Sequence, residues 1–480
     1  MTDYLAVIPI VIVTLGGLAA MLAAAIVRPG DRMPIAGFGH IVLVGAAAAS
    51  VLLWDRDAQA FGVIRADNFT LFINLVLCVV GVLTMLMSSE VVERDRLPAG
   101  EYFALTLFAI VGMMMMAAAT DLLVIFIALE VLSLAVYVLT GLRRGSAAGA
   151  EAAFKYFLLG SFSSAFFLYG IAFTYAVAGS TRLDQIGVAL SAQGTGAPQT
   201  LTLLAVGLLA VGFAFKVSAV PFHMWTPDAY EGAPTIVTAF MSTGVKAAAF
   251  ASFARVFLSP FEPLQTHWIP VLSVVAAATM IVGTLIGVVQ TNIKRMLAYS
   301  SIAHAGYLLL GIIAANSTGK AAILFYLLAY AVTNLGALGM VALLGTPKND
   351  HDQLRDFAGL WNSRPALAAL MTIFLLSLGG FPPTAGFIGK WYIFTAAVQE
   401  GHYWLAIIGV LTSVVSVFFY LRIVVMMYMS EGAPGAETGR PAVSAPAMAG
   451  LALATAAVLY LGVLPTRVLD LARDSIATIF

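Results

Sequence analysis

The sequence predicts an all-α polytopic membrane protein, and three observations support this fold class. Of its 480 residues, 61% are hydrophobic and only 10% are charged, whereas a soluble domain carries about 25% charged residues. Apolar windows of about twenty residues, the length that crosses a bilayer as a helix, recur along the whole chain. Several of these windows contain a lysine or a glutamate, and ionisable residues inside a membrane are rare and usually functional.

About fourteen membrane-spanning helices are expected from these windows. The twelfth is longer than a bilayer requires and contains Gly379, Gly380, Pro382 and Pro383, which cannot continue a regular helix. The seventh ends at Pro221, so helices 7 and 12 are expected to be discontinuous. The expected spans lie near residues 5–27, 35–54, 69–89, 102–119, 121–141, 152–178, 200–221, 234–258, 268–290, 297–315, 320–345, 366–397, 403–428 and 443–465.

The orientation of the helices is predicted from the lysines and arginines of the loops. Loops that follow odd-numbered spans carry about twice as many of them as the other loops, so the positive-inside rule puts both termini outside the cytoplasm. The loops after odd-numbered spans contain Arg28, Arg32, Arg94, Arg96, Arg143, Arg144, Lys294, Arg295, Lys348, Arg355, Arg364 and Arg440. The other loops and the tail contain Arg56, Arg65, Arg182, Lys320, Arg467 and Arg473.

Composition also excludes several classes of function. The formal net charge is zero, so nothing indicates a nucleic-acid partner. The single cysteine, Cys78, excludes an intrachain disulfide and any metal or iron–sulfur site built from several cysteines. The sequence has no Gly-rich phosphate loop and no dinucleotide fingerprint. Energy for any transport must therefore come from an ion gradient or from partner subunits.

Ionisable residues inside the spans are the first candidates for a functional site. Glu130 has no lysine one helical turn away, so it must pair with another helix, take up a proton, or simply form an interhelical hydrogen bond. Lys216 and Lys246 lie thirty positions apart, on either side of Pro221 and a polar turn, with no local acid. A lysine whose distance from Glu130 can change would accept protons with an adjustable affinity.

Three more residues extend this set. Lys390 lies about two helical turns beyond the break in helix 12, where irregular backbone survives only inside protein or beside a wet cavity. His304 can relay protons near neutral pH, or it can simply be hydrogen-bonded. Lys155 follows Glu151 at the i,i+4 spacing, so a local ion pair and snorkelling to the membrane interface are alternatives to a role in transport.

The two broken helices also suggest an internal repeat. Helix 12 comes five spans after helix 7, and a repeat of five helices must be inverted in the membrane, with an ion path at the repeat interface. The lysines are not in the same register, because Lys216 precedes its proline and Lys390 follows it. The expected units are an N-terminal three-helix segment (1–100), a first repeat (101–260), a second inverted repeat (261–430) and a C-terminal helix (431–480).

At this point three stretches resemble one family. The segment FKVSAVPFHMWTPDAYEGAPTIVTAFMSTGVKAAAF (215–250) closely resembles the signature of subunit N of the proton-pumping NADH:quinone oxidoreductase, respiratory complex I of bacteria. NIKRMLAYSSIAHAGYLLLG and GGFPPTAGFIGKWYIF resemble two further stretches of that family. The YEGAP element and a lysine in the twelfth span favour subunit N over its paralogues, and the resemblance extends over the whole chain.

The resemblance implies two inverted five-helix repeats in a bacterial inner membrane and a charged axis across the middle of that membrane. It implies that redox energy released elsewhere in the complex shifts a carboxylate–lysine pair and drives protons along the axis. Flavin, iron–sulfur clusters and quinone would belong to partner subunits, which include paralogous antiporter-like subunits, and this chain would hold no cofactor or metal. By position, the implied proton-translocating residues are Glu130 and its partner Lys216, the connecting Lys246 and His304, the outer Lys390, and a further lysine, Lys155.

Two other interpretations stay open from the sequence. A subunit of an Mrp-type cation/proton antiporter would share this fold and these lysines. A membrane anchor could instead use its buried charges only to fix assembly, and substitution of Lys216 and Lys390 would distinguish it from a proton carrier.

Overall fold

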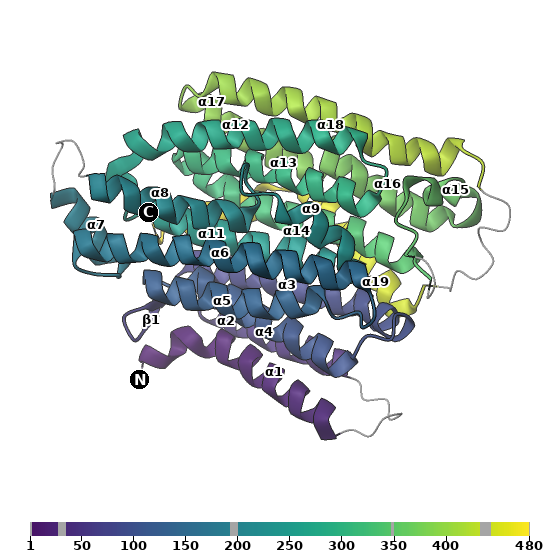
Figure 1. The fold of residues 1–480 in the computed structure, drawn as a ribbon, viewed down its shortest axis with the longest axis horizontal. Coiled ribbons are helices and arrows are strands. Elements are labelled where there is room, and N and C mark those ends of the chain that lie inside the picture. The colour runs from purple at the N-terminus through teal and green to yellow at the C-terminus, as the bar shows by residue number, and fades with distance from the viewer. Residues whose placement is uncertain (1, 27–34, 193–199, 347–349, 433–442, 480) are drawn as a thin grey trace.

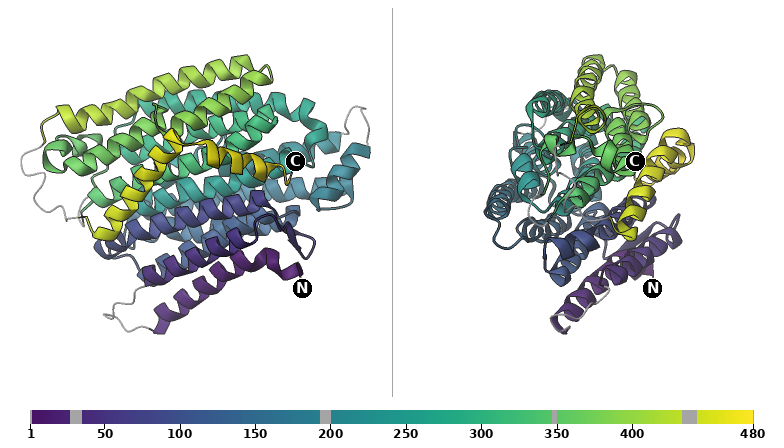
Figure 2. Two further views of the ribbon diagram at one scale, coloured as in Figure 1. Left: turned by 180° about the vertical axis from the view of Figure 1, so that it is seen from behind. Right: turned by 90° about the vertical axis from the view of Figure 1, so that its right-hand side faces the viewer.

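The computed structural model describes residues 2–26, 35–192, 200–346, 350–432 and 443–479. Its helices lie roughly side by side along the long axis and form an elongated bundle (Figure 1). Both chain ends lie toward the same end of the bundle, as the views from the front and from behind agree (Figures 1 and 2). Thirteen helices in the described ranges are long and apolar enough to cross a membrane. The all-α membrane class is therefore confirmed.

Some sequence predictions fall outside this part of the chain. The expected end of the first span, residue 27, is not among the described residues. Four of the loop cations used to predict the orientation also lie outside them: Arg28, Arg32, Lys348 and Arg440.

The N-terminal part contains two outer helices and one central one. Helices α1 and α2 are apolar on nearly every face and leave much of that surface exposed, which suits contact with lipid. Asp67 caps the next helix, because its carboxylate accepts a hydrogen bond from the backbone N–H of Thr70 at 2.8 Å. The elements are a 3₁₀ turn Thr2–Val7, α1 Ile8–Ile26, α2 Ile35–Leu52, β1 Ala58–Ala60, β2 Ile64–Ala66 and α3 Asn68–Arg94.

The short hairpin of β1 and β2 departs from the all-helical expectation. The two strands pair antiparallel, with Gln59 opposite Arg65, between the expected spans 35–54 and 69–89. Phe61 and Gly62 both have positive φ angles (55° and 68°), which closes the turn between the strands.

Two of the next helices, α5 and α6, begin at side-chain caps that the sequence supplies. Asp121 accepts a hydrogen bond from the backbone N–H of Leu123 at 2.8 Å, and Ser146 accepts one from that of Gly149 at 3.1 Å. A short amphipathic helix lies between the expected spans 152–178 and 200–221. These elements are α4 Ala99–Ala118, α5 Leu122–Thr140, α6 Ala147–Ala178 and α7 Leu183–Ala192.

The seventh span is interrupted at Pro221, as predicted. Helix α8 (Thr200–Val217) ends shortly before this proline. Residues 218–224 form irregular turns, and α9 (Trp225–Gly232) follows. The predicted eighth span then consists of α10 (Thr235–Phe240), a π-helical turn (Met241–Val245) and α11 (Lys246–Phe257). A π turn inserts one extra residue into a helix and is frequent at functional sites. Lys246 directly follows it.

The second half is built on two helices that are buried along almost their whole length, α13 and α14. The predicted twelfth span is two helices, α16 and α17, separated by residues 380–384. Its elements are a 3₁₀ turn Glu262–Leu264, α12 Gln265–Val289, α13 Ile293–Ala314, α14 Ser317–Leu344, a 3₁₀ turn Leu354–Phe357, α15 Leu360–Ser363, α16 Pro365–Gly379, α17 Ala385–Gln399 and α18 Tyr403–Met429.

The C-terminal part extends further than predicted. The last span was expected to end near residue 465, but α19 (Ala445–Val463) is followed at once by the amphipathic helix α20 (Thr466–Ile476). The chain bends between them where α19 meets the break in helix 12. A Cβ on Gly462 would lie 2.1 Å from the carbonyl oxygen of Pro383, so only glycine allows this approach of the two backbones.

Candidate functional site

Four of the predicted site residues are buried in the bundle. Lys216, Lys246, His304 and Lys390 are each less than 5% exposed. Burying an ammonium group is costly unless polar groups surround it. The partners of each side chain therefore decide what it can do.

Glu130 and Lys216 lie in one region, but each binds a serine. Ser164 on α6 donates a hydrogen bond to Glu130 Oε1. Lys216 Nζ donates to Ser133 Oγ at 2.8 Å, and Ser133 lies one helical turn beyond Glu130 on α5. No ion pair within 4.0 Å joins Glu130 and Lys216 in the described structure. Their direct pairing remains a prediction.

Aromatic rings and a small cavity surround the Lys216 ammonium. Nζ lies 5.7 Å from the ring centroid of Tyr137 and 5.5 Å from that of Tyr156, within the range of cation–π attraction. The cavity is lined by Ser164 from the Glu130 side and by Lys216 itself. The cavity has a volume of about 10 Å³ and lies between α5, α6 and α8, beside the ammonium.

Lys246 is held by α13. Its Nζ donates hydrogen bonds to the carbonyl oxygen and the hydroxyl of Ser301, at 2.5 and 2.6 Å. It also lies 5.4 Å from the ring centroid of Tyr330 on α14. Every one of these groups is neutral, so no carboxylate fixes the charge of this lysine.

His304 is bonded to two tyrosines. Nδ1 lies 2.7 Å from the hydroxyl of Tyr326, and Nε2 lies 3.4 Å from the hydroxyl of Tyr420. Tyr420 is also hydrogen-bonded to Ser300, which neighbours the Lys246 partner Ser301 in sequence. The histidine is thus hydrogen-bonded, as one alternative predicted, within a polar network that reaches toward Lys246.

Lys390 folds back onto the break in helix 12. Its Nζ donates to the carbonyl oxygens of Leu378 and Gly379, at 2.9 and 3.1 Å, and to Ser413 Oγ at 2.8 Å. These carbonyls belong to the C-terminal end of α16, where the helix dipole is negative. Of the predicted break residues, Gly379 and Gly380 therefore lie against this ammonium, whereas Pro382 and Pro383 are exposed.

Lys155 lies apart from the buried set. Its side chain is 42% exposed and forms ion pairs with Glu151 at 2.7 Å and Asp228 at 2.8 Å. Asp228 also binds Arg295 at 2.8 Å. Burial opposes ionisation of Asp228, but Lys155 and Arg295 hold its pKa below the ordinary value. The local pair with Glu151 that the spacing suggested is present.

Sequence reasoning missed most partners of the lysines. Serines and tyrosines inside apolar helices carry no formal charge, so they gave no signal in a search for ionisable residues. The missed partners are Ser133, Tyr137, Tyr156, Ser164, Tyr326, Tyr330, Ser413 and Tyr420. The one available signal was the i,i+4 spacing of Tyr326 and Tyr330 on α14.

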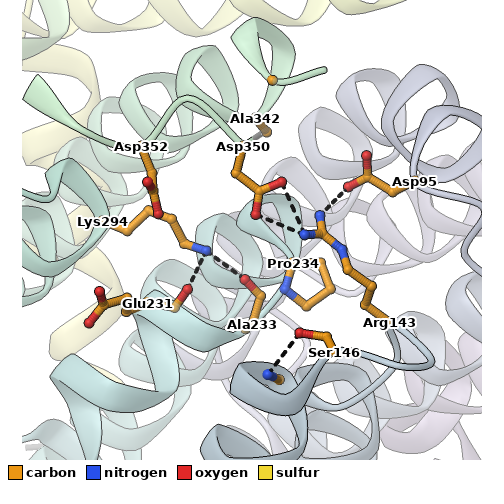
Figure 3. A network of polar contacts seen from close by, with 12 residues as sticks. Asp95, Arg143, Ser146, Glu231, Ala233, Pro234, Lys294, Ala342, Asp350 and Asp352 are labelled. Atoms are coloured by element: carbon orange, nitrogen blue, oxygen red, sulfur yellow. Dashed lines mark hydrogen bonds and ion pairs between the residues drawn. The ribbon is translucent and has the colours of Figure 1, made fainter. Parts of the chain in front are cut away.

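A second charged network closes one end of the bundle (Figure 3). Arg143, after α5, binds Asp350 at 2.8 Å and also pairs with Asp95, after α3. Burial opposes the ionisation of Asp350, but Arg143 and the nearby Lys294 hold its pKa below the ordinary value. Lys294 itself donates to the carbonyl oxygens of Glu231 and Ala233. The network joins loops from both halves.

Among the side chains that the structure describes, no group of three or more His, Cys, Asp or Glu residues could hold a metal ion.

Comparisons with known proteins agree with this arrangement. The family described as "NADH:quinone oxidoreductase/Mrp antiporter, TM" matches residues 119–416, more than half of the chain. NADH-quinone oxidoreductase subunit N of Trichlorobacter lovleyi is 44% identical over 474 residues, covering 98% of this chain and 97% of the relative. Subunit N 1 of Solibacter usitatus is 43% identical over 478 residues, covering 99% and 98%.

Solved structures give the same result. A chain of respiratory complex I from Thermus thermophilus, solved with bound aureothin, has a TM-score of 0.81 and 35% identity, and the match covers 97% of this chain and 100% of that one. A chain of the Mrp complex from Dietzia sp. DQ12-45-1b has a TM-score of 0.84 at 21% identity, covering 100% and 97%, and shares the fold. The chain therefore belongs to the subunit N family of NADH-quinone oxidoreductase, one of the antiporter-like membrane subunit families.

Proposed function

We propose that this chain translocates protons as an antiporter-like subunit of NADH:quinone oxidoreductase, using the row Glu130, Lys216, Lys246, His304 and Lys390. The observation that carries the proposal is the burial of four ionisable groups whose partners are neutral hydroxyls and carbonyls. Such groups are costly inside a membrane, so they are rare there and usually mark an ion or proton pathway.

In the second half of the row, polar contacts run almost without interruption. Lys246 binds Ser301, and the neighbouring Ser300 binds Tyr420, which contacts His304. Tyr307, one turn from His304, places its ring 5.2 Å from Lys390 Nζ and its hydroxyl 3.4 Å from Thr412. Hydroxyls both donate and accept hydrogen bonds, so they can conduct protons between the titrating groups.

In the first half, the proposed driving event is a change in the distance between Glu130 and Lys216. Glu130 binds Ser164 on α6 and Lys216 binds Ser133 on α5, so a shift of α5, α6 or α8 would change the distance between the carboxylate and the ammonium. A nearby carboxylate raises the proton affinity of a lysine, and each pKa unit is worth about 1.4 kcal/mol. Moving one charge through 100 mV requires about 2.3 kcal/mol. A change of about two units in the pKa of the lysine is therefore enough to drive the transfer of one proton.

The proposed architecture is two inverted five-helix repeats. The interruptions after α8 and after α16 lie in spans 7 and 12, which supports a repeat of five. The units are residues 1–100, 101–260 (spans 4–8), 261–430 (spans 9–13) and 431–480. Both termini lie at one end of the bundle, and the loop cations favour the periplasmic side of a bacterial inner membrane for that end.

Lys155 belongs to the end of the proposed pathway rather than to the buried row. It shares Asp228 with Arg295, in an exposed cluster at the end of the bundle to which the loop cations assign the cytoplasm. We propose that this cluster exchanges protons with water, near the irregular segment that follows Lys216.

The proposed function requires partner subunits. Relatives of this chain are subunits of NADH-quinone oxidoreductase, so flavin, iron–sulfur clusters and quinone are assigned to other subunits, among them paralogous antiporter-like ones. The second candidate is an Mrp-type antiporter subunit, since a chain of an Mrp complex shares the fold. Co-purification of NADH:quinone activity with the chain favours the first candidate, and its absence favours the second.

The test is Lys216→Met in the assembled enzyme, with Lys294→Met as the matched control. Both lysines are buried, but Lys294 donates its hydrogen bonds in the described structure to the carbonyls of Glu231 and Ala233, in the charged network outside the row. We expect the Lys216 variant to assemble and to lose at least about tenfold of its NADH-driven proton pumping, the loss of one transfer group. The control should keep pumping per assembled enzyme. Unchanged pumping in the Lys216 variant would exclude the proposal, and loss of assembly alone would favour the anchor interpretation.

A further inference from the structure

Helix α14 carries a polar stripe that the pathway above does not use. Tyr326, Tyr330, Thr333 and Asn334 are all buried, with at most 3% of their surface exposed. Their spacing of three or four residues places them on one face of the helix. Because α14 is buried along nearly its whole length, this face points into protein rather than lipid.

Tyr330 lies between two groups of the proposed row. Its ring centroid is 5.4 Å from Lys246 Nζ and 5.2 Å from the ring centroid of His304. One turn earlier, Tyr326 bonds His304 Nδ1 at 2.7 Å. Tyr330 is therefore in contact with the lysine and the histidine at once.

Asn334, one turn further along, binds the π-helical turn before Lys246. Its side-chain nitrogen donates to Ser242 Oγ at 2.8 Å. Ser242 belongs to the π turn Met241–Val245, which ends where Lys246 begins. Asn334 thus holds the backbone segment that carries this lysine.

Two buried polar atoms of the stripe have no hydrogen-bond partner within 3.5 Å among the described residues: Tyr330 Oη, which lies near the Ser301 side chain, and Asn334 Oδ1. A buried polar atom left unpaired costs about 1–3 kcal/mol. Buried groups of this kind are typically satisfied by an ordered water with two to four polar partners.

We propose that Tyr330 and Asn334 bind an internal water beside Lys246, and that Tyr330 is a further proton-carrying residue linking Lys246 to His304. The water accepts a proton from the Lys246 ammonium, which becomes a neutral amine. The Tyr330 hydroxyl accepts a proton from the water on one lone pair and passes its own to the unprotonated ring nitrogen of His304, which becomes an imidazolium ion. No net charge stays on the tyrosine. This inference rests on the proposed function and deepens it.

The first test compares Tyr330→Phe with Tyr102→Phe in the assembled enzyme. Both changes remove one hydroxyl and keep the ring. Tyr102 lies on α4 and is bonded to Ser88 on α3 at 2.7 Å, away from the row. We expect Tyr330→Phe to lower proton pumping about tenfold and to raise its solvent deuterium isotope effect. This is less than the ~100-fold that a positioned acid or base can contribute. Tyr102→Phe should leave both quantities unchanged.

Equal pumping and equal isotope effects in the two variants would overturn the inference. If Lys216→Met abolishes pumping while Tyr330→Phe does not, this inference fails and the proposed function stands. If neither variant affects pumping, both fail.

The second test is direct observation of the site in a high-resolution density map of the assembled complex. We expect a water peak within hydrogen-bond distance of both Tyr330 Oη and Asn334 Oδ1. A dry site, or a direct bond between the two side chains, would contradict the inference even if Tyr330→Phe failed to fold.

Discussion

Lys216 and Lys390 lie beside the two broken helices, yet the two halves of the molecule hold them differently. Lys216 binds a side chain, Ser133, one turn from Glu130, and sits in a small cavity between aromatic rings. Lys390 binds two backbone carbonyls at the end of α16, together with Ser413.

This difference separates an adjustable site from a fixed one. A carboxylate can gain a proton or move, so the surroundings of Lys216 can change by a whole charge. The carbonyls around Lys390 cannot titrate, and the negative end of a helix dipole is a permanent partial charge. We infer that the first half responds to the driving event and that the second half offers protons a constant acceptor.

Other cations in the chain bind helix ends as Lys390 does. Lys294 binds the carbonyls of Glu231 and Ala233, and Arg422 binds those of Val288 and Gln290. Such contacts stabilise the end of a helix without any transport. Lys390 could therefore be a structural cap, and the predictions below distinguish the two roles.

The largest effect is expected from Lys390→Arg. Arginine keeps the positive charge and can still bind the α16 carbonyls, but with a pKa above about 12 it does not release its proton. The enzyme should assemble normally and lose at least about tenfold of its proton pumping. Lys294→Arg, which replaces a lysine bound to helix-end carbonyls, serves as the control and should pump normally. Normal pumping by the Lys390 variant would make Lys390 a cap.

A smaller effect is expected from Glu130→Gln. The amide can still accept the hydrogen bond from Ser164, but it removes the charge that adjusts Lys216. Pumping should fall several-fold while assembly is unaffected. Ser164→Ala, which keeps the carboxylate, should change pumping by less than twofold, a loss of about 0.5 kcal/mol or less. If Glu130→Gln and Ser164→Ala lower pumping equally, the charge of Glu130 does not control the proton affinity of Lys216.

Gly380→Ala tests the Lys390 site by changing the backbone beside the lysine. Gly380 has a φ of +83°, and an added Cβ would lie 3.0 Å from Lys390 Cδ. An L-residue in this conformation costs roughly 1–2 kcal/mol, and the methyl group would push the lysine away from the carbonyls. We expect reduced thermal stability and a two- to threefold loss of pumping. Gly401→Ala, also at positive φ but with nothing within 4 Å of its added Cβ, should lose stability alone.

The smallest effect concerns the network at the end of the bundle, outside both lysine sites. Because Arg143 holds the pKa of Asp350 below 3.8, the pair stabilises the folded chain at pH 7. That stabilisation is lost as the pH falls below about 4 and through the lowered pKa. Asp350→Asn should lower the melting temperature in detergent by roughly 1–2 °C at pH 7. The difference between the two proteins should shrink as the pH falls from about 4 through the lowered pKa of Asp350, and a constant difference would contradict the ion pair.

Sequence reasoning predicted the fold class and the buried charges well for physical reasons. Lysines in apolar windows and paired prolines are conspicuous, so Lys216, Lys390 and both broken helices could be identified without coordinates. Helix α20 was missed because a charged amphipathic segment does not resemble a span.

The partners of the charges were much harder to predict. The contact between Lys390 and the α16 carbonyls depends on how the chain folds back at Gly380, which no spacing rule gives. Tyr330 and Asn334 were overlooked because neutral polar residues are common in helices, and only the packing of α14 against Lys246 makes them informative.

The central claim is that protons travel on the lysines themselves. The most direct measurement is NADH-driven proton pumping by the assembled enzyme with both Lys216→Arg and Lys390→Arg, which keeps both charges but prevents their release. The account predicts an assembled enzyme that builds no proton gradient through this subunit. Pumping with the unaltered ratio of protons to electrons would contradict it.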